Sequence, residues 1–136
     1  MPNPSAVGAA WTATAGGLAV RPQLVLVGPA AGGIAATLTV VHAPLARPPP
    51  LARLPGLVGR VGGLRAAGVP RRLALGGRPA LAYDYRVAVA GRPLHARQVA
   101  CVHGGELWFV TLVAAPGGFD AAAAALERLT RAWRWT

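Results

Sequence analysis

Residues 81–115 read LAYDYRVAVAGRPLHARQVACVHGGELWFVTLVAA and contain the pattern that decides the fold. Side chains alternate with the period of two that is typical of β-strands in three runs, residues 81–89, 94–102 and 107–115. Gly91-Arg92 fits a two-residue hairpin turn with glycine first, and Gly104-Gly105 makes a second tight turn. The stretch therefore predicts a three-stranded antiparallel meander.

Two-residue turns would also fix which side chains share a face of this meander. The resulting register pairs Arg86 with Arg97, Asp84 with Val99, and Cys101 with Trp108. One face, here called the tyrosine face, is predicted to be a core face backed by the last helix, and it collects Leu81, Tyr83, Tyr85, Val87, Val89, Gln98, Ala100, Val102, Leu107, Phe109, Thr111 and Val113. The opposite face, here called the mixed face, collects Asp84, Arg86, His95, Arg97, Val99, Cys101, Trp108, Val110 and Leu112.

Outward from the meander, the same patterns predict further elements. Strand-like runs cover residues 11–20, 24–27 and 34–41, and Gly28 to Gly33 between the last two has turn chemistry. The uncharged stretch 24–41 therefore indicates two strands and a loop, against the alternative of a membrane span. Pro48-Pro49-Pro50 and the spacing of Leu51, Leu54, Val58, Val61 and Leu64 predict an amphipathic helix over 51–67.

The C-terminal residues carry a clear helix signal. Phe119, Ala122, Leu126, Leu129 and Trp133 form an apolar stripe. An acid in the first turn and arginines in the last turns match the helix dipole. The predicted order is strand, strand, helix, meander and helix, which indicates an α+β domain over residues 11–136 after a flexible leader of residues 1–10.

Several short motifs of the second half resemble the bacterial PsbP-like superfamily, which includes LpqN-type lipoproteins and the effector-associated (Eag-type) chaperones of type VI secretion. They are Gly77-Arg78-Pro79-Ala80, the strand Glu106 to Leu112 with its Trp and Thr, Ala115-Pro116 and Phe119-Asp120. The resemblance covers residues 77–134 in residue pattern and 11–136 in element order. It implies an α/β/α sandwich around an antiparallel, twisted sheet of about six strands, and a binding or chaperone role without catalysis.

The charge balance favours an anionic partner. All 14 basic residues are arginine and only four acids oppose them, which gives a net charge of +10. The absence of lysine, with heavy use of Ala, Gly, Pro and Arg, is typical of high-GC bacterial coding. The arginines are scattered along the chain, and Arg71-Arg72 is the one adjacent pair, so a nucleic-acid ligand is the weaker alternative.

Catalytic, metal and cofactor sites find little support in the residue types. The single Cys101 precludes an intrachain disulfide and favours a reducing cytoplasm, and residues 1–5 have no basic region leading into an apolar stretch. Cys101 and His103 share a strand face and would suit a nucleophile pair or half a metal site. The alternative, a half-buried thiol beside a strand-end histidine, is favoured because no third ligand is near. His42 and His95 are interpreted as surface or strand-end residues, and we expect no enzyme, no metal and no cofactor.

The mixed face is the predicted docking surface for a partner. Trp108 lies at its centre, with Arg86, Arg97, Asp84 and Val110 around it, and a tryptophan among guanidinium groups is typical of interfaces. The paired arginines would repel one another until an acidic partner group relieved them. In the alternative interpretation, the helix over 51–64 covers this face and the arginines reach around its rim.

Two main classes of function follow, and an enzyme is a third. The favoured one is a non-enzymatic protein-binding module, a chaperone or adaptor for a secreted or envelope-associated client with an acidic or apolar segment. The single cysteine favours a cytoplasmic location, and the resembled group implies a homodimer. The other class is a basic protein that binds nucleic acid or an anionic surface through its positive charge. An enzyme built on Cys101 and His103 is the third and least supported hypothesis.

Overall fold

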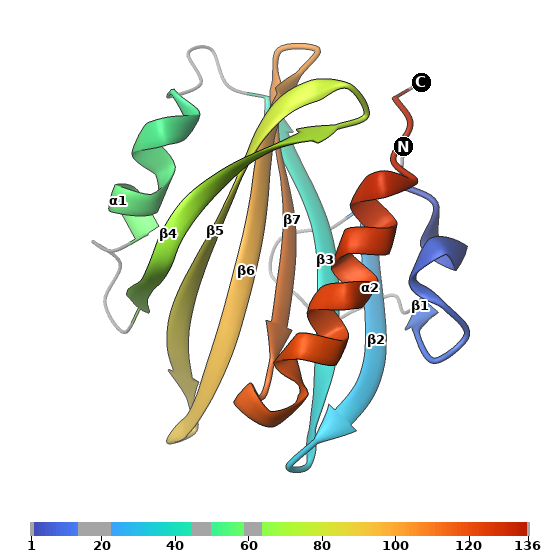
Figure 1. Cartoon of the computed structure of the whole chain (residues 1–136), viewed down its shortest axis with the longest axis vertical. Helices are drawn as coiled ribbons and strands as arrows, with labels where there is room; N and C mark the ends of the chain where they lie inside the picture. Colours follow the sequence, from blue (N-terminus) through green and yellow to red (C-terminus); the bar gives the residue numbers. More distant parts are fainter. Residues whose placement is uncertain (1, 14–22, 45–49, 59–63, 136) are drawn as a thin grey trace.

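The structure, a computed structural model, describes residues 2–13, 23–44, 50–58 and 64–135. The described residues form one antiparallel seven-stranded sheet in the order β1-β2-β3-β7-β6-β5-β4 (Figure 1). The strands are β1 (Thr12–Ala13), β2 (Leu24–Ala31), β3 (Ile34–Pro44), β4 (Leu64–Leu75), β5 (Arg78–Val89), β6 (Arg92–His103) and β7 (Glu106–Ala114). The helices are η1 (Pro4–Val7), η2 (Leu51–Arg53), α1 (Leu54–Val58), η3 (Pro116–Gly118) and α2 (Phe119–Arg131).

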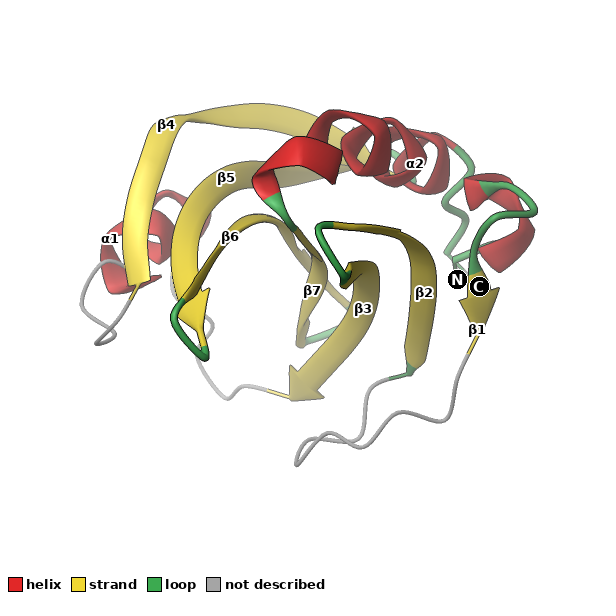
Figure 2. Cartoon of the chain, turned by 90° about the horizontal axis from the view of Figure 1, so that it is seen from below, coloured by secondary structure: helices red, strands yellow, loops and turns green. Residues whose placement is uncertain are grey.

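The two α-helices lie on opposite faces of the sheet, which confirms the predicted α/β/α arrangement (Figure 2). Leu54 of α1 packs against Leu81 and Leu107 on one face. Leu126 of α2 packs against Val110 on the other face. Six strands, β2 to β7, are long, and the short helix α1 lies between the β2–β3 pair and the C-terminal strands, as the sequence predicts.

The C-terminal helix is confirmed with its predicted stripe. Phe119, Ala122, Leu126 and Leu129 are buried in the main core, together with Trp133 just after the helix. Positions three and four apart fall on one side of a helix, so this spacing gives α2 one apolar side to bury against the sheet.

The helix predicted over 51–67 is confirmed only in its first half. Residues 51–58 are helical, as the 3-10 helix η2 and then α1, whereas Leu64 to Ala67 belong to β4; residues 59–63 lie outside the described part. Glycines in this segment disfavour a helix. Strand β4 is instead held by its pairing with β5, which continues on both sides of a bulge between Ala67 and Arg71. The sequence pattern predicts no strand here, so β4 was missed.

The turn between β5 and β6 differs from the predicted one. Val89 pairs with Arg92, so the two turn residues are Ala90 and Gly91, both with positive φ (51° and 75°). This places Asp84 opposite Arg97 and Arg86 opposite His95, a shift of two residues from the predicted pairs. Such a shift preserves which face each side chain occupies, because the strand repeat is two residues. The predicted pairing of Cys101 with Trp108 is confirmed.

The N-terminal residues pack as part of the domain, which corrects the expectation of a flexible leader. Val7 of η1 is 1% exposed in the main core. Its carbonyl oxygen accepts a hydrogen bond of 2.9 Å from Nη2 of Arg128 on α2. Trp11 lies so close to Gly28 that a Cβ there would fall 2.6 Å from the indole.

The uncharged stretch 24–41 folds as the predicted pair of strands. Strand β2 continues through Gly28 to Ala31, and the turn itself is only Gly32-Gly33, because Ala31 pairs with Ile34. No helix in the described ranges is both long and apolar enough to cross a membrane.

Candidate functional site

The predicted centre of the docking surface lies inside the protein. Trp108 is 6% exposed and Val110 is 0% exposed, in the same cluster as Leu126 and Trp133. Helix α2 therefore covers the mixed face, and the prediction that this helix backs the tyrosine face is wrong. The alternative cover, a helix over 51–64, is also wrong, because Leu54 of α1 packs on the tyrosine face. An alternating pattern cannot tell which face the helix covers when both faces carry large apolar side chains.

Trp108 is held in an aromatic cluster. Its ring stacks on His42 at 4.3 Å and meets the edges of Trp133 and Trp135 at 6.2 and 5.3 Å. His42 also pairs with Glu106 at 3.0 Å. This cluster joins β3, β7 and the residues that follow α2, so its role is packing.

The three polar residues predicted with Trp108 lie further along the same face, at the edge of the cover that α2 provides. Asp84 Oδ1 accepts a hydrogen bond of 2.7 Å from Arg97 Nε, and Oδ2 accepts one of 3.0 Å from Arg97 Nη2. His95 Nε2 lies 2.8 Å from the same carboxylate. Burial acts to raise the pKa of Asp84, but the hydrogen bonds from Arg97 and His95 outweigh it and hold that pKa below its usual value.

Phe119, the first residue of α2, orients this charged group. The His95 ring stacks on the Phe119 ring at a centroid distance of 3.6 Å, and the Arg97 guanidinium lies 5.1 Å from the same centroid. Arg97 is thus fixed by one carboxylate and one aromatic ring. A side chain held in this way loses little further entropy when it binds a ligand.

Arg86 is exposed and lies beside another cation. It is directly opposite Arg65 on β4 and His95 on β6. Arg86 therefore faces another arginine, as predicted, but this arginine is Arg65 of β4 and not Arg97 of β6. We call the surface of Arg65, Arg71, Arg86 and Arg97 the arginine face; the register places all four on the α2 side of the sheet. Like charges directly opposite one another destabilise a sheet, so this surface favours an anionic ligand.

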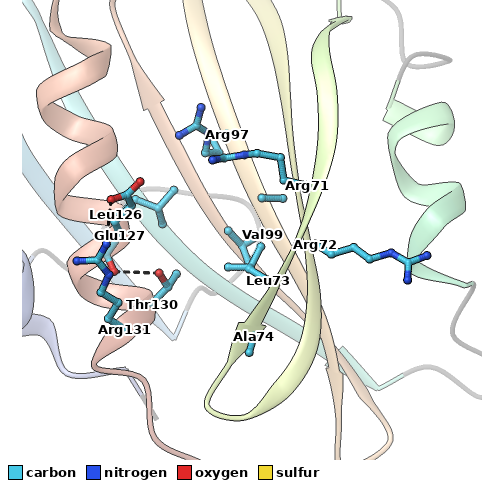
Figure 3. Close-up of a pocket in the computed structure, with 11 residues that line it drawn as sticks. Arg71, Arg72, Leu73, Ala74, Arg97, Val99, Leu126, Glu127, Thr130 and Arg131 are labelled. Atoms are coloured by element: carbon cyan, nitrogen blue, oxygen red, sulfur yellow. Dashed lines mark hydrogen bonds and ion pairs between the residues drawn. The ribbon is translucent and has the colours of Figure 1, made fainter.

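The arginine face continues into a groove between β4 and α2 (Figure 3). The groove holds about 290 Å³, near the lower end for ligand sites. Arg71 extends into it toward Arg97, whereas the side chain of Arg72 extends away. We call it the arginine groove; it is lined by Arg71, Arg72, Leu73, Ala74, Ala82, Arg97, Val99, Leu126, Glu127, Thr130 and Arg131.

The lining of the arginine groove combines cations with an apolar wall. Asp84 already pairs with Arg97, and Glu127 lies 3.6 Å from Arg131 in an exposed pair. In the part of the chain that the structure describes, no carboxylate forms an ion pair with Arg71. Leu73, Val99 and Leu126 supply the apolar surface. The groove therefore suits an anionic group attached to an apolar one, on the scale of one or two side chains.

Cys101 and His103 do not form a reactive pair. Cys101 is 0% exposed, and its thiol donates a hydrogen bond of 3.4 Å to the carbonyl oxygen of Pro79. Burial raises its pKa, which disfavours the thiolate that a nucleophile needs. His103 instead stacks on Trp135 at 4.0 Å. Among the described residues, no group of three His, Cys, Asp or Glu side chains could hold a metal ion.

Sequence reasoning missed the β4 half of the arginine groove. Arg71 and Leu73 were not placed on any element, although Gly76-Gly77 is followed by a clear strand. A two-glycine turn before a strand indicates a second strand in front of it. That signal would have predicted β4 from Leu75 backwards.

No protein-family model and no curated protein matches the sequence. Solved structures are similar in fold. LpqN of Mycobacterium tuberculosis, described as involved in cell envelope biogenesis, is 14% identical with a TM-score of 0.75, over 93% of this chain and 79% of that one. A Pseudomonas aeruginosa protein of unknown function, PA94, described as a putative regulator, is 19% identical with a TM-score of 0.68, over 82% and 81%.

The PsbP protein of Synechocystis sp. PCC 6803, CyanoP, is 12% identical with a TM-score of 0.64, over 94% of this chain and 83% of that one. Identities this low show the fold and leave the function to the site. The chain has the PsbP-like fold that its motifs over residues 77–134 resemble.

Proposed function

We propose that the protein is a non-enzymatic protein-binding module, a chaperone or adaptor, whose client places an acidic, partly apolar segment in the arginine groove. The observation that carries the proposal is the position of Arg71, unpaired with any described carboxylate, beside the apolar wall of Leu73 and Leu126. Guanidinium groups bind carboxylates with directed, charge-assisted hydrogen bonds.

Two further features support this function. Asp84 and Phe119 fix Arg97 at the groove, so its guanidinium is positioned before a ligand arrives. The net charge of +10 attracts acidic segments over a distance and raises their rate of encounter.

The nature of the client and the cellular setting are part of the proposal. A secreted or envelope-associated client and a homodimer follow from the resemblance to effector-associated chaperones, and a cytoplasmic location follows from the single cysteine. The description of LpqN as involved in cell envelope biogenesis agrees with such a client. A fold shared at low identity supports this setting only as an analogy.

A basic surface for nucleic acid is the second candidate, favoured by the row of Arg65, Arg71 and Arg86. Proteins that bind single strands commonly stack bases on exposed aromatic rings. Phe119, whose ring lies beside the Arg97 guanidinium, is buried, and so is Trp108 on the same sheet face. The protein-binding function is therefore preferred.

The test is site-specific cross-linking. A photoreactive amino acid at Glu127, an exposed residue of α2 that lines the arginine groove, is compared with one at Ala52, an exposed position in η2. We expect a defined protein partner to cross-link from position 127, to be lost with Arg71→Glu, and to persist with the charge-matched control Arg53→Glu.

Two results would contradict the proposal. One is a partner that cross-links equally from both positions or that ignores Arg71→Glu. The other is nucleic acid as the dominant cross-linked species, with an affinity for random DNA that falls steeply with salt.

A further inference from the structure

The arginine groove meets β4 along its edge. Four consecutive residues of this strand, 71–74, line the groove. Successive side chains of a strand point to opposite faces, so side chains from one face alone cannot account for all four. Arg72 lines the groove even though its side chain extends away from it (Figure 3). The main chain of β4 therefore borders the groove.

The hairpin register identifies which main-chain groups point outward. Leu75 pairs with Arg78 across Gly76-Gly77, whose φ values of 56° and 81° indicate a primed two-residue turn, and such a turn is closed by a hydrogen-bonded pair. Hydrogen-bonded and non-hydrogen-bonded pairs then alternate along the antiparallel ladder. Ala74 with Pro79 is a non-hydrogen-bonded pair, which agrees with the missing N–H of proline.

The same alternation makes Arg72 with Leu81 a non-hydrogen-bonded pair. The N–H and C=O groups of Arg72 and Ala74 thus point away from β5. Strand β4 is the last strand of the described sheet on this side, so no described strand pairs with these four groups. They form a short row of donors and acceptors beside Arg71 and Leu73.

We propose that the partner binds as an added β-strand, in which an extended acidic segment pairs with the main chain of Arg72 and Ala74 at the edge of β4. This inference rests on the proposed function and gives its binding mode. One row of partner side chains would enter the arginine groove, with an acidic residue at Arg71 and an apolar residue at Leu73. The other row would lie beside Arg72, where a second acid fits. The partner segment therefore carries two neighbouring acidic residues and then an apolar one, with the residues opposite Arg71 and Leu73 on the same face.

Charge selects such a partner over a second copy of the chain. Pairing two β4 edges would bring Arg71 and Arg72 of one copy close to the same residues of the other, and like charges across strands repel. The bulge at Gly68 to Pro70 also interrupts the strand, which shortens the edge available for pairing. An acidic strand is attracted by Arg71 and Arg72, and it can pair with residues 71–75, which lie beyond the bulge.

The experiment uses the full chain and a short end-blocked peptide that repeats Glu-Glu-Val-Val, which places both acidic and apolar residues in each row of side chains. Two variants separate the main chain from the side chain: Ala74→Pro removes the outward N–H, and the control Ala74→Val keeps it. We expect Ala74→Pro to weaken binding about tenfold and Ala74→Val to bind like the wild type. Circular dichroism establishes that both variants fold.

Two forms of the peptide give a test that needs no variant. One carries N-methyl groups on the odd-numbered residues and the other on the even-numbered residues. In an added strand only alternate nitrogens face β4. We expect one form to bind like the parent peptide and the other to fail. In the free protein the amides of Arg72 and Ala74 should exchange with solvent faster than those of Arg71 and Leu73, and the parent peptide should protect them.

The outcomes separate this inference from the proposed function. If Arg71→Glu abolishes peptide binding while Ala74→Pro and both methylated forms bind normally, strand addition is overturned and the groove function stands. If Arg71→Glu has no effect on peptide binding, both are overturned. Slow exchange of the Arg72 and Ala74 amides in the free protein would overturn the derived edge geometry.

Discussion

Asp84 lies directly opposite Arg97 on the neighbouring strand and binds its guanidinium through both carboxylate oxygens, at 2.7 and 3.0 Å. This pair fixes the register of the β5–β6 hairpin, because the alternative pairing would set Arg86 against Arg97. It also holds one wall of the arginine groove in place.

Asp84→Asn should lower the free energy of unfolding at neutral pH by about 1.5–3 kcal/mol, as expected for hydrogen bonds to a charged group. The pKa of Asp84 is lowered from 3.8 in the folded protein, because hydrogen bonds from Arg97 and His95 outweigh the effect of burial. Its carboxylate therefore stabilises the fold above the ordinary pKa, and this contribution is lost as pH falls through the lower, folded-state pKa. Urea unfolding of both proteins at pH 7 and pH 3 measures the effect.

The matched control for this pair is Glu127→Gln. It breaks an exposed pair in which Arg131 lies 3.6 Å away, so its effect should be close to zero at either pH. A difference between wild type and Asp84→Asn that stays constant from pH 7 to pH 3 would contradict the role of the carboxylate charge.

Trp108→Ala should destabilise the fold by about 3–5 kcal/mol, because it opens a cavity beneath α2 among Trp133 and Trp135. Chemical denaturation followed by circular dichroism measures the loss. An unchanged unfolding midpoint together with lost partner binding would instead restore Trp108 as a surface contact.

Arg86→Ala should leave stability unchanged or raise it by up to about 1 kcal/mol, since it removes a like charge opposite Arg65. The double variant with Arg65→Ala should gain less than the sum of the single changes, because either change alone relieves the repulsion. Thermal unfolding at low salt tests this; additive or destabilising single changes would refute the repulsion.

Gly76→Ala should destabilise the protein more than Gly77→Ala. Both glycines have positive φ, so both substitutions strain the turn. At Gly76 alone a Cβ would also fall 2.6 Å from the Trp135 ring, whereas at Gly77 nothing lies within 4 Å. Thermal unfolding and tryptophan fluorescence compare the two, and equal losses would show that the docked Trp135 moves aside without cost.

Cys101 should react with a thiol reagent only as fast as the protein opens. It is buried beneath the sheet surface, and burial raises its pKa, so the native thiol is both inaccessible and protonated. Labelling kinetics in native buffer and in urea check this expectation. Rapid labelling of the native protein would reopen the hypothesis of a reactive Cys101.

The predictable parts of this fold were those set by local chemistry. Gly104-Gly105 supplies two residues that adopt positive φ, so the β6–β7 register follows from the sequence. The β5–β6 register did not, because Ala90 adopts a positive φ that the sequence gives no reason to expect. The tertiary pair of Asp84 with Arg97 outweighs that local preference.

The candidate site was predictable only in part, for a reason of topology. Asp84, Arg86 and Arg97 were placed on the correct face by their alternation along the strands. The position of α2 over Trp108 depends on packing between residues far apart in the sequence, and no local pattern specifies it. The groove needed β4, whose residues Gly68 and Pro70 obscure a strand pattern.

The pairing of β3 with β7, here called the seam because it joins the two halves of the sheet, has a consequence for the folding rate. Every other pairing in the described sheet beyond β1 joins consecutive strands, but this ladder brings together Thr37 and Val113. Closing so long a loop costs entropy before any contact rewards it. We therefore expect the hairpins to form early and the seam to limit the folding rate, as in other domains with high contact order. Until it closes, neither half of the sheet offers α2 its complete docking surface.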